Sequence, residues 1–249
     1  MNNMGNSSFW HKLIRSVMVR GDVQNIESVA CKKVVADAIQ LENSKKQFRF
    51  ITKYYDQNIY QIFSRINQQS NIKTVLDVGT AMGDVISTVA AQNPRVNFFA
   101  IDIMDEAIEI AQRNYCGITN VKFKKANFLG DSVMSCADVV VCLQTLEHIE
   151  DHTLIPFIEK LFKTARCAVV VSVPREPYWC FANLLRLKYW SRLGNTPHHV
   201  QHWRMQSFEK VCRNIASQVW TSKYEVVKKS PLHLWTILVF MKEDVCHAK

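Results

Sequence analysis

The sequence lacks the features that mark a secreted, zinc-ribbon or membrane-spanning protein. Its eight cysteines include no Cys-x-x-Cys pair, so neither a zinc ribbon nor a disulfide framework is indicated. No apolar run approaches the roughly 18 residues of a membrane span, and the start, MNNMGNSSFW, has no basic-then-apolar signal pattern. Only 7 glycines and 6 prolines are present, which argues against a disordered chain. We therefore expect a folded, reduced, cytoplasmic protein.

Acidic residues are scarce at both ends of the chain and concentrated in its middle. The net charge of the 249 residues is +9, divided into +6 over residues 1–73, −5 over residues 74–150 and +8 over residues 151–249. Two interpretations stay open: ordinary solvated faces, or basic surfaces that face an anionic substrate, nucleic acid or a membrane. Charge alone does not choose between them.

Hydrophobic periodicity divides the chain into two parts. Residues 1–70 show helical spacing, in FWHKLIRSVM (9–18) and again in 48–66, and predict a helical N-terminal extension. The first of these stripes fits packing on the core as well as a position on a membrane surface. From residue 71 to 249 short apolar runs alternate with amphipathic stretches, which is typical of βαβ units around a parallel sheet.

The end of the chain departs from this alternation. A helical pattern near 206–217 is followed by YEVVKK and HLWTILVFM, which are separated by the short connector SPLH and predict an antiparallel hairpin. The predicted fold is therefore α/β: a Rossmann-like seven-stranded, mostly parallel sheet with helices on both faces and an antiparallel last strand.

A glycine-rich turn follows the first predicted strand in VLDVGTAMGD. Asp77 ends the strand, and Gly79, Ala81 and Gly83 are spaced through the turn. Neither the dinucleotide fingerprint Gly-x-Gly-x-x-Gly nor the Gly-Lys-Ser/Thr of a phosphate-binding loop is present. Asp102 ends the second strand, where a carboxylate can accept both hydroxyls of a ribose. An acid before the turn suits a ligand that carries an ammonium and a sulfonium rather than phosphates.

Four segments together resemble the class I S-adenosylmethionine-dependent methyltransferases, and more closely their UbiE/UbiG-like, or methyltransferase type 11, branch. These segments are VLDVGTAMG, FFAIDIMDEAIEIAQRN, VKFKKANF and DVVVCLQTLEHIED, in the family's order and spacing over about residues 73–175. The resemblance implies an enzyme that uses S-adenosylmethionine and releases S-adenosylhomocysteine. It also implies a set of cofactor-binding residues: Asp77, Gly79, Thr80, Ala81, Gly83, Asp102, Ile103, Asn127, Phe128, Leu143 and Gln144.

Two of these positions depart from the family's pattern. Ala81 replaces the usual middle glycine, and its Cβ is tolerable there if its φ is negative. Asn127 stands where the family often has Asp, so it keeps one acceptor for the adenine amino group but loses the charge. The alternative is a catalytically silent scaffold that keeps the fold for partner binding.

The residues after the fourth predicted strand bear on the methyl acceptor. Enzymes of this fold that methylate planar amines in nucleic acid often carry Asn/Asp-Pro-Pro-aromatic there, whereas residues 143–146 read LQTL, which favours an oxygen or carbon acceptor. Glu147 and His148 match the Leu-Glu-His of the UbiG-like branch. His148 is a candidate general base, and both residues also suit a purely structural role. Relatives with Glu-x-x-Glu-His and a distant His bind a divalent cation, but Gln144 replaces the first Glu, so we expect no metal.

Residues 174–203, PREPYWCFANLLRLKYWSRLGNTPHHVQHW, predict a lid over the acceptor pocket. The stretch YWCFANLLRLKYWSRL is compatible with a helix that mixes aromatic, leucine and basic side chains. His199 and His202, with Glu147, are candidate helpers of His148. We expect methyl transfer to a small or lipid-linked acceptor, with an RNA methyltransferase as the alternative. Peripheral membrane contact and the oligomeric state are left open, and a nucleic-acid partner is not expected.

Overall fold

The computed structural model describes residues 49–243, so the apolar stripe at 9–18 lies outside the described residues. The chain divides into two compact units at Lys53 and Tyr54, and the second unit contains the sheet. The helix α3 (Arg49–Gln69) begins before this boundary and covers residues 49–66 of the predicted helical stretch 48–66.

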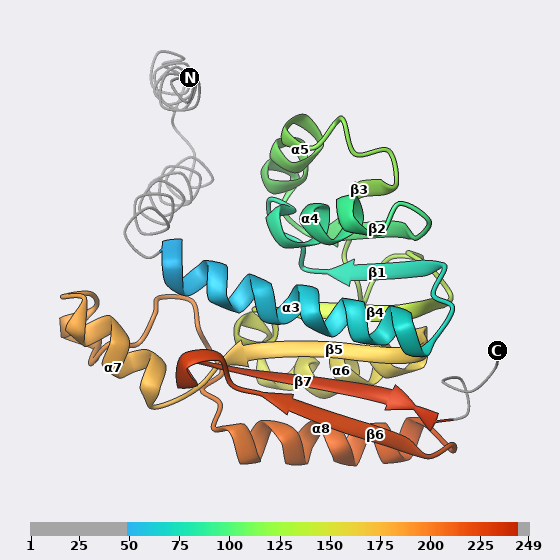
Figure 1. Cartoon of the computed structure of the whole chain (residues 1–249). Helices are drawn as coiled ribbons and strands as arrows, with labels where there is room; N and C mark the ends of the chain where they lie inside the picture. Colours follow the sequence, from blue (N-terminus) through green and yellow to red (C-terminus); the bar gives the residue numbers. More distant parts are fainter. Residues whose placement is uncertain (1–48, 244–249) are drawn as a thin grey trace. The chain divides into compact units, whose positions relative to one another are not determined.

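A seven-stranded sheet with the order β3-β2-β1-β4-β5-β7-β6 forms the centre of the unit (Figure 1). Five strands pair in parallel, and β7 pairs antiparallel with both β5 and β6. This arrangement confirms the predicted Rossmann-like sheet and its antiparallel end. The bounds of the strands are β1 Thr74–Val78, β2 Asn97–Asp102, β3 Val121–Lys125, β4 Ala137–Leu143, β5 Ala165–Pro174, β6 Tyr224–Lys229 and β7 Trp235–Lys242.

Helices connect the strands in the order expected of βαβ units. Those between parallel strands are α4 (Asp84–Gln92), α5 (Asp105–Asn114) and α6 (Asp151–Thr164), and α8 (Met205–Val219) precedes the hairpin. Short helices complete the chain: η1 Leu146–His148, α7 Tyr178–Leu185, η2 Trp190–Arg192 and η3 Pro231–His233. In the described part of the chain no helix is long and apolar enough to cross a membrane.

The core explains why the central strands read as unbroken apolar runs. Val140 of β4 and Val170 of β5 are fully buried, because helices cover the sheet on both faces. On one face Phe162 of α6 packs its ring 5.0 Å from that of Phe240 and 5.1 Å from that of Trp220, measured between centroids. Helix α3 crosses the sheet in front of β4 and β5 in the view of Figure 1, whereas α6 lies behind β5.

The lid departs from its sequence-based description in one respect. Within the helix-compatible stretch 178–193, the α-helix α7 ends at Leu185, and only the short 3-10 turn η2 follows. The carbonyl of Asn183 accepts hydrogen bonds from the backbone N–H groups of Arg186 and Lys188, at 3.1 and 2.9 Å. This closes the helix, and the chain then passes through left-handed conformations that no helix continues.

Candidate functional site

The turn after β1 requires glycine at two positions. Gly79 has φ 79° and Gly83 has φ 76°, in the left-handed region where an L side chain is strained. A Cβ at Gly79 would collide with the side chain of Thr145, and one at Gly83 would lie 2.6 Å from the Phe123 ring. The backbone N–H groups of Gly79 and Thr80 donate to the Ile101 carbonyl at 2.9 and 3.0 Å, which fixes the turn against the end of β2.

Ala81 does not meet the condition of a negative φ set by the sequence analysis. Its φ is +48°, so an L residue occupies a left-handed position, at a cost of roughly 1 kcal/mol. The geometry is held because the Ala81 N–H donates to Oδ2 of Asp102 at 2.8 Å, while the Met104 N–H donates to Oδ1 at 2.9 Å. The Asp102 carboxylate thus joins the glycine turn to the loop after β2, where Ile103 is 63% exposed.

Asp77 lies beneath the turn and is nearly excluded from water. It is 5% exposed, and burial raises its pKa to about 7, with a further increase from the charge of Asp102. The hydroxyl of Thr80 lies near enough to lower this pKa but does not form a well-aligned hydrogen bond. A carboxyl in this position is ready to ionise when a positive group approaches.

The loop after β3 uses its polar side chains for its own turn. Oδ1 of Asn127 accepts from the N–H groups of Leu129 and Gly130 at 3.0 and 3.3 Å, and the Asn127 N–H donates to Asp131 at 2.7 Å. The acceptor that the sequence analysis assigned to adenine is therefore engaged, which leaves the amide N–H₂ group to face a ligand. The Phe128 side chain is 4% exposed in the core, so only its backbone can reach this loop's surface.

Beyond β4 the chain turns through Leu143 and Gln144 towards β5. Leu143 is half-buried, and Gln144 has a φ of +54°. The Gln144 side chain donates from Nε2 to Oγ of Ser172 at 3.0 Å. Tyr55 of α3, a residue that sequence reasoning missed, places its hydroxyl 2.5 Å from the same oxygen. A separation of 117 positions leaves no spacing signal that would connect the tyrosine with the serine.

Glu147, His148 and His199 converge just past β4. One donor atom from each lies within 4.8 Å of the others, and the two imidazole rings meet edge to face with centroids 4.9 Å apart. Glu147 is 1% exposed, and its Oε2 atom has no hydrogen-bond partner within residues 49–243. Burial raises the pKa of Glu147 to about 8, so this carboxyl is mostly protonated at neutral pH.

The hydrogen bonding of His148 fixes its tautomer. Nδ1 lies 3.0 Å from the carbonyl oxygen of His198, and because a carbonyl can only accept, Nδ1 carries the hydrogen and Nε2 keeps a lone pair. Burial lowers the pKa of His148. Burial and the neighbouring histidines, His148 first among them, lower the pKa of His199 to about 3. Both rings are therefore neutral at pH 7, and each keeps a lone pair on one ring nitrogen.

His202 lies apart from this cluster. Its Nδ1 is 3.8 Å from a carboxylate oxygen of Glu176, with 44% of the imidazole side chain exposed. The segment between the two lid histidines is tied to the cluster, because the N–H groups of Val200 and Gln201 donate to the Glu147 carbonyl at 2.9 and 3.0 Å. The structure thus brings together three of the four proposed catalytic side chains.

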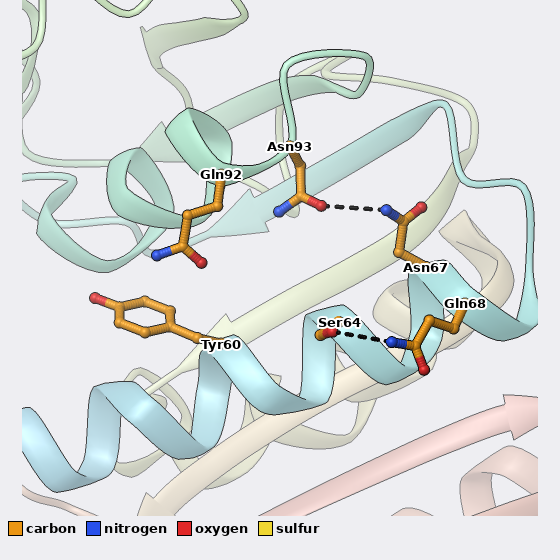
Figure 2. A pocket seen from close by; sticks show the side chains of 6 residues that line it. All are labelled: Tyr60, Ser64, Asn67, Gln68, Gln92 and Asn93. Atoms are coloured by element: carbon orange, nitrogen blue, oxygen red, sulfur yellow. Dashed lines mark hydrogen bonds between the residues drawn. The ribbon is translucent and has the colours of Figure 1, made fainter.

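A separate hollow of about 290 Å³ lies between α3 and the end of α4 (Figure 2). Its lining is polar and carries no carboxylate, ammonium or imidazole group. An Asn67–Asn93 amide pair at 3.2 Å closes one side, and burial raises the pKa of Tyr60. Because no group there can exchange a proton near pH 7, we do not take it as the reaction site. The lining residues are Tyr60, Ser64, Asn67, Gln68, Gln92 and Asn93.

A family profile and curated proteins match parts of this sequence. The profile of a family described as "Methyltransferase domain" matches residues 69–225, more than half of the chain. Among curated proteins, a release factor glutamine methyltransferase from Koribacter versatilis is 41% identical over 56 residues. That segment covers 22% of this chain and 20% of the relative, so the match spans about a fifth of the relative's length.

Solved structures show the same fold at low sequence identity. Magnesium protoporphyrin IX methyltransferase from Synechocystis PCC 6803, with S-adenosylhomocysteine bound, has a TM-score of 0.61 at 14% identity and covers 96% of both chains. The methyltransferase domain of a bacterial Hen1 protein has a TM-score of 0.59 at 16% identity, over 77% of this chain and 99% of that domain. These likenesses concern the fold.

Proposed function

The chain belongs to the family of S-adenosylmethionine-dependent methyltransferase domains, and from this premise we propose that it methylates a hydroxyl oxygen of a small or lipid-linked acceptor. We also propose that residues 71–249 form the catalytic domain, with 174–203 as its lid and 1–70 as a helical extension. The UbiE/UbiG-like branch stays a prediction. The observation that carries the proposal is the neutral His148, a member of the Glu147–His148–His199 cluster whose Nε2 atom keeps a lone pair.

Three observations support cofactor binding at the glycine turn after β1. Two left-handed glycines leave the backbone open to close approach. Asp77, with a pKa raised to about 7, gains a favourable partner when an ammonium binds beside it. Asp102 ends β2 at the position of a ribose ligand, and the exposed Ile103 offers an apolar surface for a planar ring. Leu143 and Gln144 border the same turn, because Thr145 donates to the Gly79 carbonyl at 3.4 Å.

The acceptor step follows from the neutral histidine. As the oxygen of the acceptor bonds to the methyl carbon, the bond from that carbon to sulfur breaks, and the hydroxyl proton passes to Nε2 of His148. The products are the methyl ether or ester and S-adenosylhomocysteine. Holding oxygen, carbon and sulfur in line is the main contribution of the enzyme, and a positioned base adds about 10²–10⁴-fold. His199 packs against the His148 ring and orients it.

Replacing the proposed base tests this step. We expect His148→Ala to lower turnover about 100-fold or more and to leave the affinity for S-adenosylhomocysteine, measured by calorimetry, unchanged. His152→Ala is the matched control, since that histidine is exposed on α6 and should change neither quantity. A library of phenols, carboxylic acids and their prenylated forms, with radiolabelled methyl donor, supplies the acceptor. Unchanged turnover of the His148→Ala variant removes His148 from the mechanism.

The local likeness to release factor glutamine methyltransferases defines a second arm of the same assay. A glutamine-bearing peptide and a structured RNA are offered beside the library. Labelling of the peptide alone would make this chain a protein methyltransferase, and labelling of the RNA alone would make it an RNA methyltransferase. Each of these outcomes contradicts an oxygen acceptor. Failure to bind S-adenosylhomocysteine at all would instead support the silent scaffold.

A second role for the same cluster is supported by its donor set. Three donor atoms within 4.8 Å, one of them on a buried carboxyl with an unpartnered oxygen, suit a divalent cation, which would supply a lower pKa for the acceptor hydroxyl. Gln144, by contrast, is turned towards Ser172. Calorimetric titration with Mn²⁺ against the wild type and Glu147→Gln decides the matter. Binding lost in the variant would support the cation role, and chelator-insensitive turnover would exclude it.

A further inference from the structure

The exposed large apolar side chains of the described residues are concentrated on the lid. Of the twelve such residues within 49–243, six lie between positions 178 and 193. The most exposed are Leu187 at 79% and Leu193 at 76%. This density is far above the scattered apolar residues that soluble surfaces normally carry. The six residues are Tyr178, Phe181, Leu185, Leu187, Trp190 and Leu193.

Three of these residues lie on one face of α7. Tyr178, Phe181 and Leu185 are three and four positions apart in α7 and therefore share a helix face. Leu187, Trp190 and Leu193 follow in the irregular chain after the helix, where their exposure is 60% or more. Figure 1 shows α7 projecting from the sheet beyond the carboxyl end of β5. Within the described residues its outer face is exposed, with Phe181 at 61% and Leu185 at 69%.

The side of the lid that faces inward is held by hydrogen bonds and by the Trp179 ring, which packs on the ring of Trp235. Asn183 is 1% exposed, and its amide donates to the Gly194 carbonyl at 2.8 Å and to the Thr196 hydroxyl at 3.2 Å. Trp179 donates to the same hydroxyl at 2.9 Å. A Cβ at Gly194 would collide with the Cys180 carbonyl, so the two arms of the lid meet closely. The lid is thus built with bonded amides inside and bare apolar side chains outside.

The backbone holds the outward side chains in unfavourable conformations. Leu187, Tyr189 and Leu193 have φ values of 56°, 54° and 51°, all in the left-handed region. Such conformations are uncommon for bulky residues. Both a strained backbone and an exposed leucine disfavour the folded state, and at Leu187 and Leu193 they occur together. The inward hydrogen bonds maintain this arrangement.

The charge around the apolar face has one sign. Arg186, Lys188 and Arg192 are interspersed with the six apolar residues, and the sequence contains no Asp or Glu between Glu176 and Glu209. Aromatic and leucine side chains with basic residues beside them are the composition of surfaces that lie in a membrane interface and contact anionic headgroups.

We propose that the face formed by residues 178–193 docks the protein on an anionic phospholipid bilayer. Its rings and leucines enter the headgroup region, and Lys188 and Arg192 contact lipid phosphates. Arg186 is turned inward instead, where it donates to the Asn183 amide oxygen and lies over the Trp179 ring. The inference does not require a particular methyl acceptor. It places the Glu147–His148–His199 cluster at the membrane side of the domain, since the lid chain that follows is bonded to Glu147.

Vesicle co-sedimentation of the full chain tests the proposal. We expect binding to vesicles of 70% phosphatidylcholine and 30% phosphatidylglycerol at 0.1 M salt, and at least tenfold weaker binding to phosphatidylcholine alone. The triple variant Phe181→Ser, Leu185→Ser, Trp190→Ser should lose at least tenfold of the partition coefficient. Ile155→Ser removes an exposed apolar residue of α6, 48% exposed, and should bind as the wild type does.

Variants that each remove one positive charge measure the electrostatic contribution to vesicle binding. Lys188→Gln and Arg192→Gln should each weaken binding to anionic vesicles about fivefold and leave the small binding to neutral vesicles unchanged. Affinity for S-adenosylhomocysteine, measured in parallel, should stay at the wild-type value in every variant, which shows that the fold is intact. Loss of methyl transfer to soluble acceptors would count against the proposed function, whereas only the vesicle measurements test the docking surface.

Several results would overturn the proposal. One is no sedimentation with anionic vesicles at 0.1 M salt; another is equal sedimentation of the triple variant and the wild type. Tight binding of homopolymeric RNA that the charge variants abolish, with vesicles not bound, would make the surface a nucleic-acid site. A dimer that the triple variant dissociates, again without vesicle binding, would make it a contact between copies of this chain.

Discussion

The turn after β1 and the cluster after β4 are assembled in different ways. The first joins positions close in sequence, from Asp77 to Asp102, and its bonds run between backbone groups and one carboxylate. The second gathers Glu147 and His199 from segments 52 positions apart, and Tyr55 reaches the adjoining Ser172 from α3. Local conformational demands therefore determine the turn, whereas the packing of the whole domain determines the cluster. Substitutions in the turn and substitutions in the cluster should therefore have different effects on cofactor affinity, turnover and stability.

The largest effect is expected from Gly79→Ala. The new Cβ would stand in a left-handed residue and collide with Thr145, which together should cost roughly 2 kcal/mol or more. We expect affinity for S-adenosylhomocysteine to fall at least 30-fold in calorimetry, with a lower melting temperature. Gly117→Ala is the control, because a Cβ there meets nothing within 4 Å. Equal affinities in the two variants would show that the turn does not contact the cofactor.

The two lid histidines offer a finer comparison within the cluster. His199 faces the His148 ring at a centroid distance of 4.9 Å, whereas His202 pairs with Glu176 near the surface. His199→Gln should lower kcat about tenfold and shift the acid limb of the pH–rate profile, because the environment of His148 changes. His202→Gln should alter kcat less than twofold. A reversed order would mean that the lid closes differently over a bound acceptor.

The titration of Glu147 should contribute to the pH dependence of the domain's stability. Its pKa rises from 4.5 to about 8 on folding, so between these values the folded state binds more protons than the unfolded state, and stability falls as pH rises. Glu147→Gln should flatten the decline between pH 5 and 8 by up to about 1 kcal/mol per pH unit. Urea unfolding at three pH values measures it. If stability declines equally in both proteins, another group causes the pH dependence. Asp77, whose pKa is also raised, would then be the next residue to replace.

Much of the fold was predictable from the sequence for a physical reason. Strands buried on both faces are mostly apolar, so β1, β4 and β5 were recognisable, and the Gly79–Gly83 spacing located the turn. The hydrogen-bonded link from Tyr55 to Ser172 and the early end of α7 at Leu185 were not predictable. Both depend on contacts between distant segments, which leave no period in the sequence.

The site shows the same division. Glu147 and His148 could be named because they are adjacent in a motif, and their proximity to His199 was a conjecture from residue type alone. Asn127 is an exception to this division, because its bonds to Leu129 and Gly130 are local and were still missed: its side chain had been assigned to a ligand. An Asx turn of this kind can be read from an Asn followed by glycine three residues later.

Ala81 gives the smallest and most specific test of local control. Because its φ is +48°, Ala81→Gly should relieve the strain while keeping the N–H bond to Asp102, and it should stabilise the domain by about 0.5–1 kcal/mol. For a domain of this size that is a melting temperature about 1–4 °C higher. Ala91→Gly makes the same exchange at an exposed position inside α4, where glycine costs about 1 kcal/mol. The two variants should therefore shift the melting temperature in opposite directions, since only the backbone conformation of the replaced alanine differs, and a decrease in both would mean that Ala81 is not held in the left-handed region.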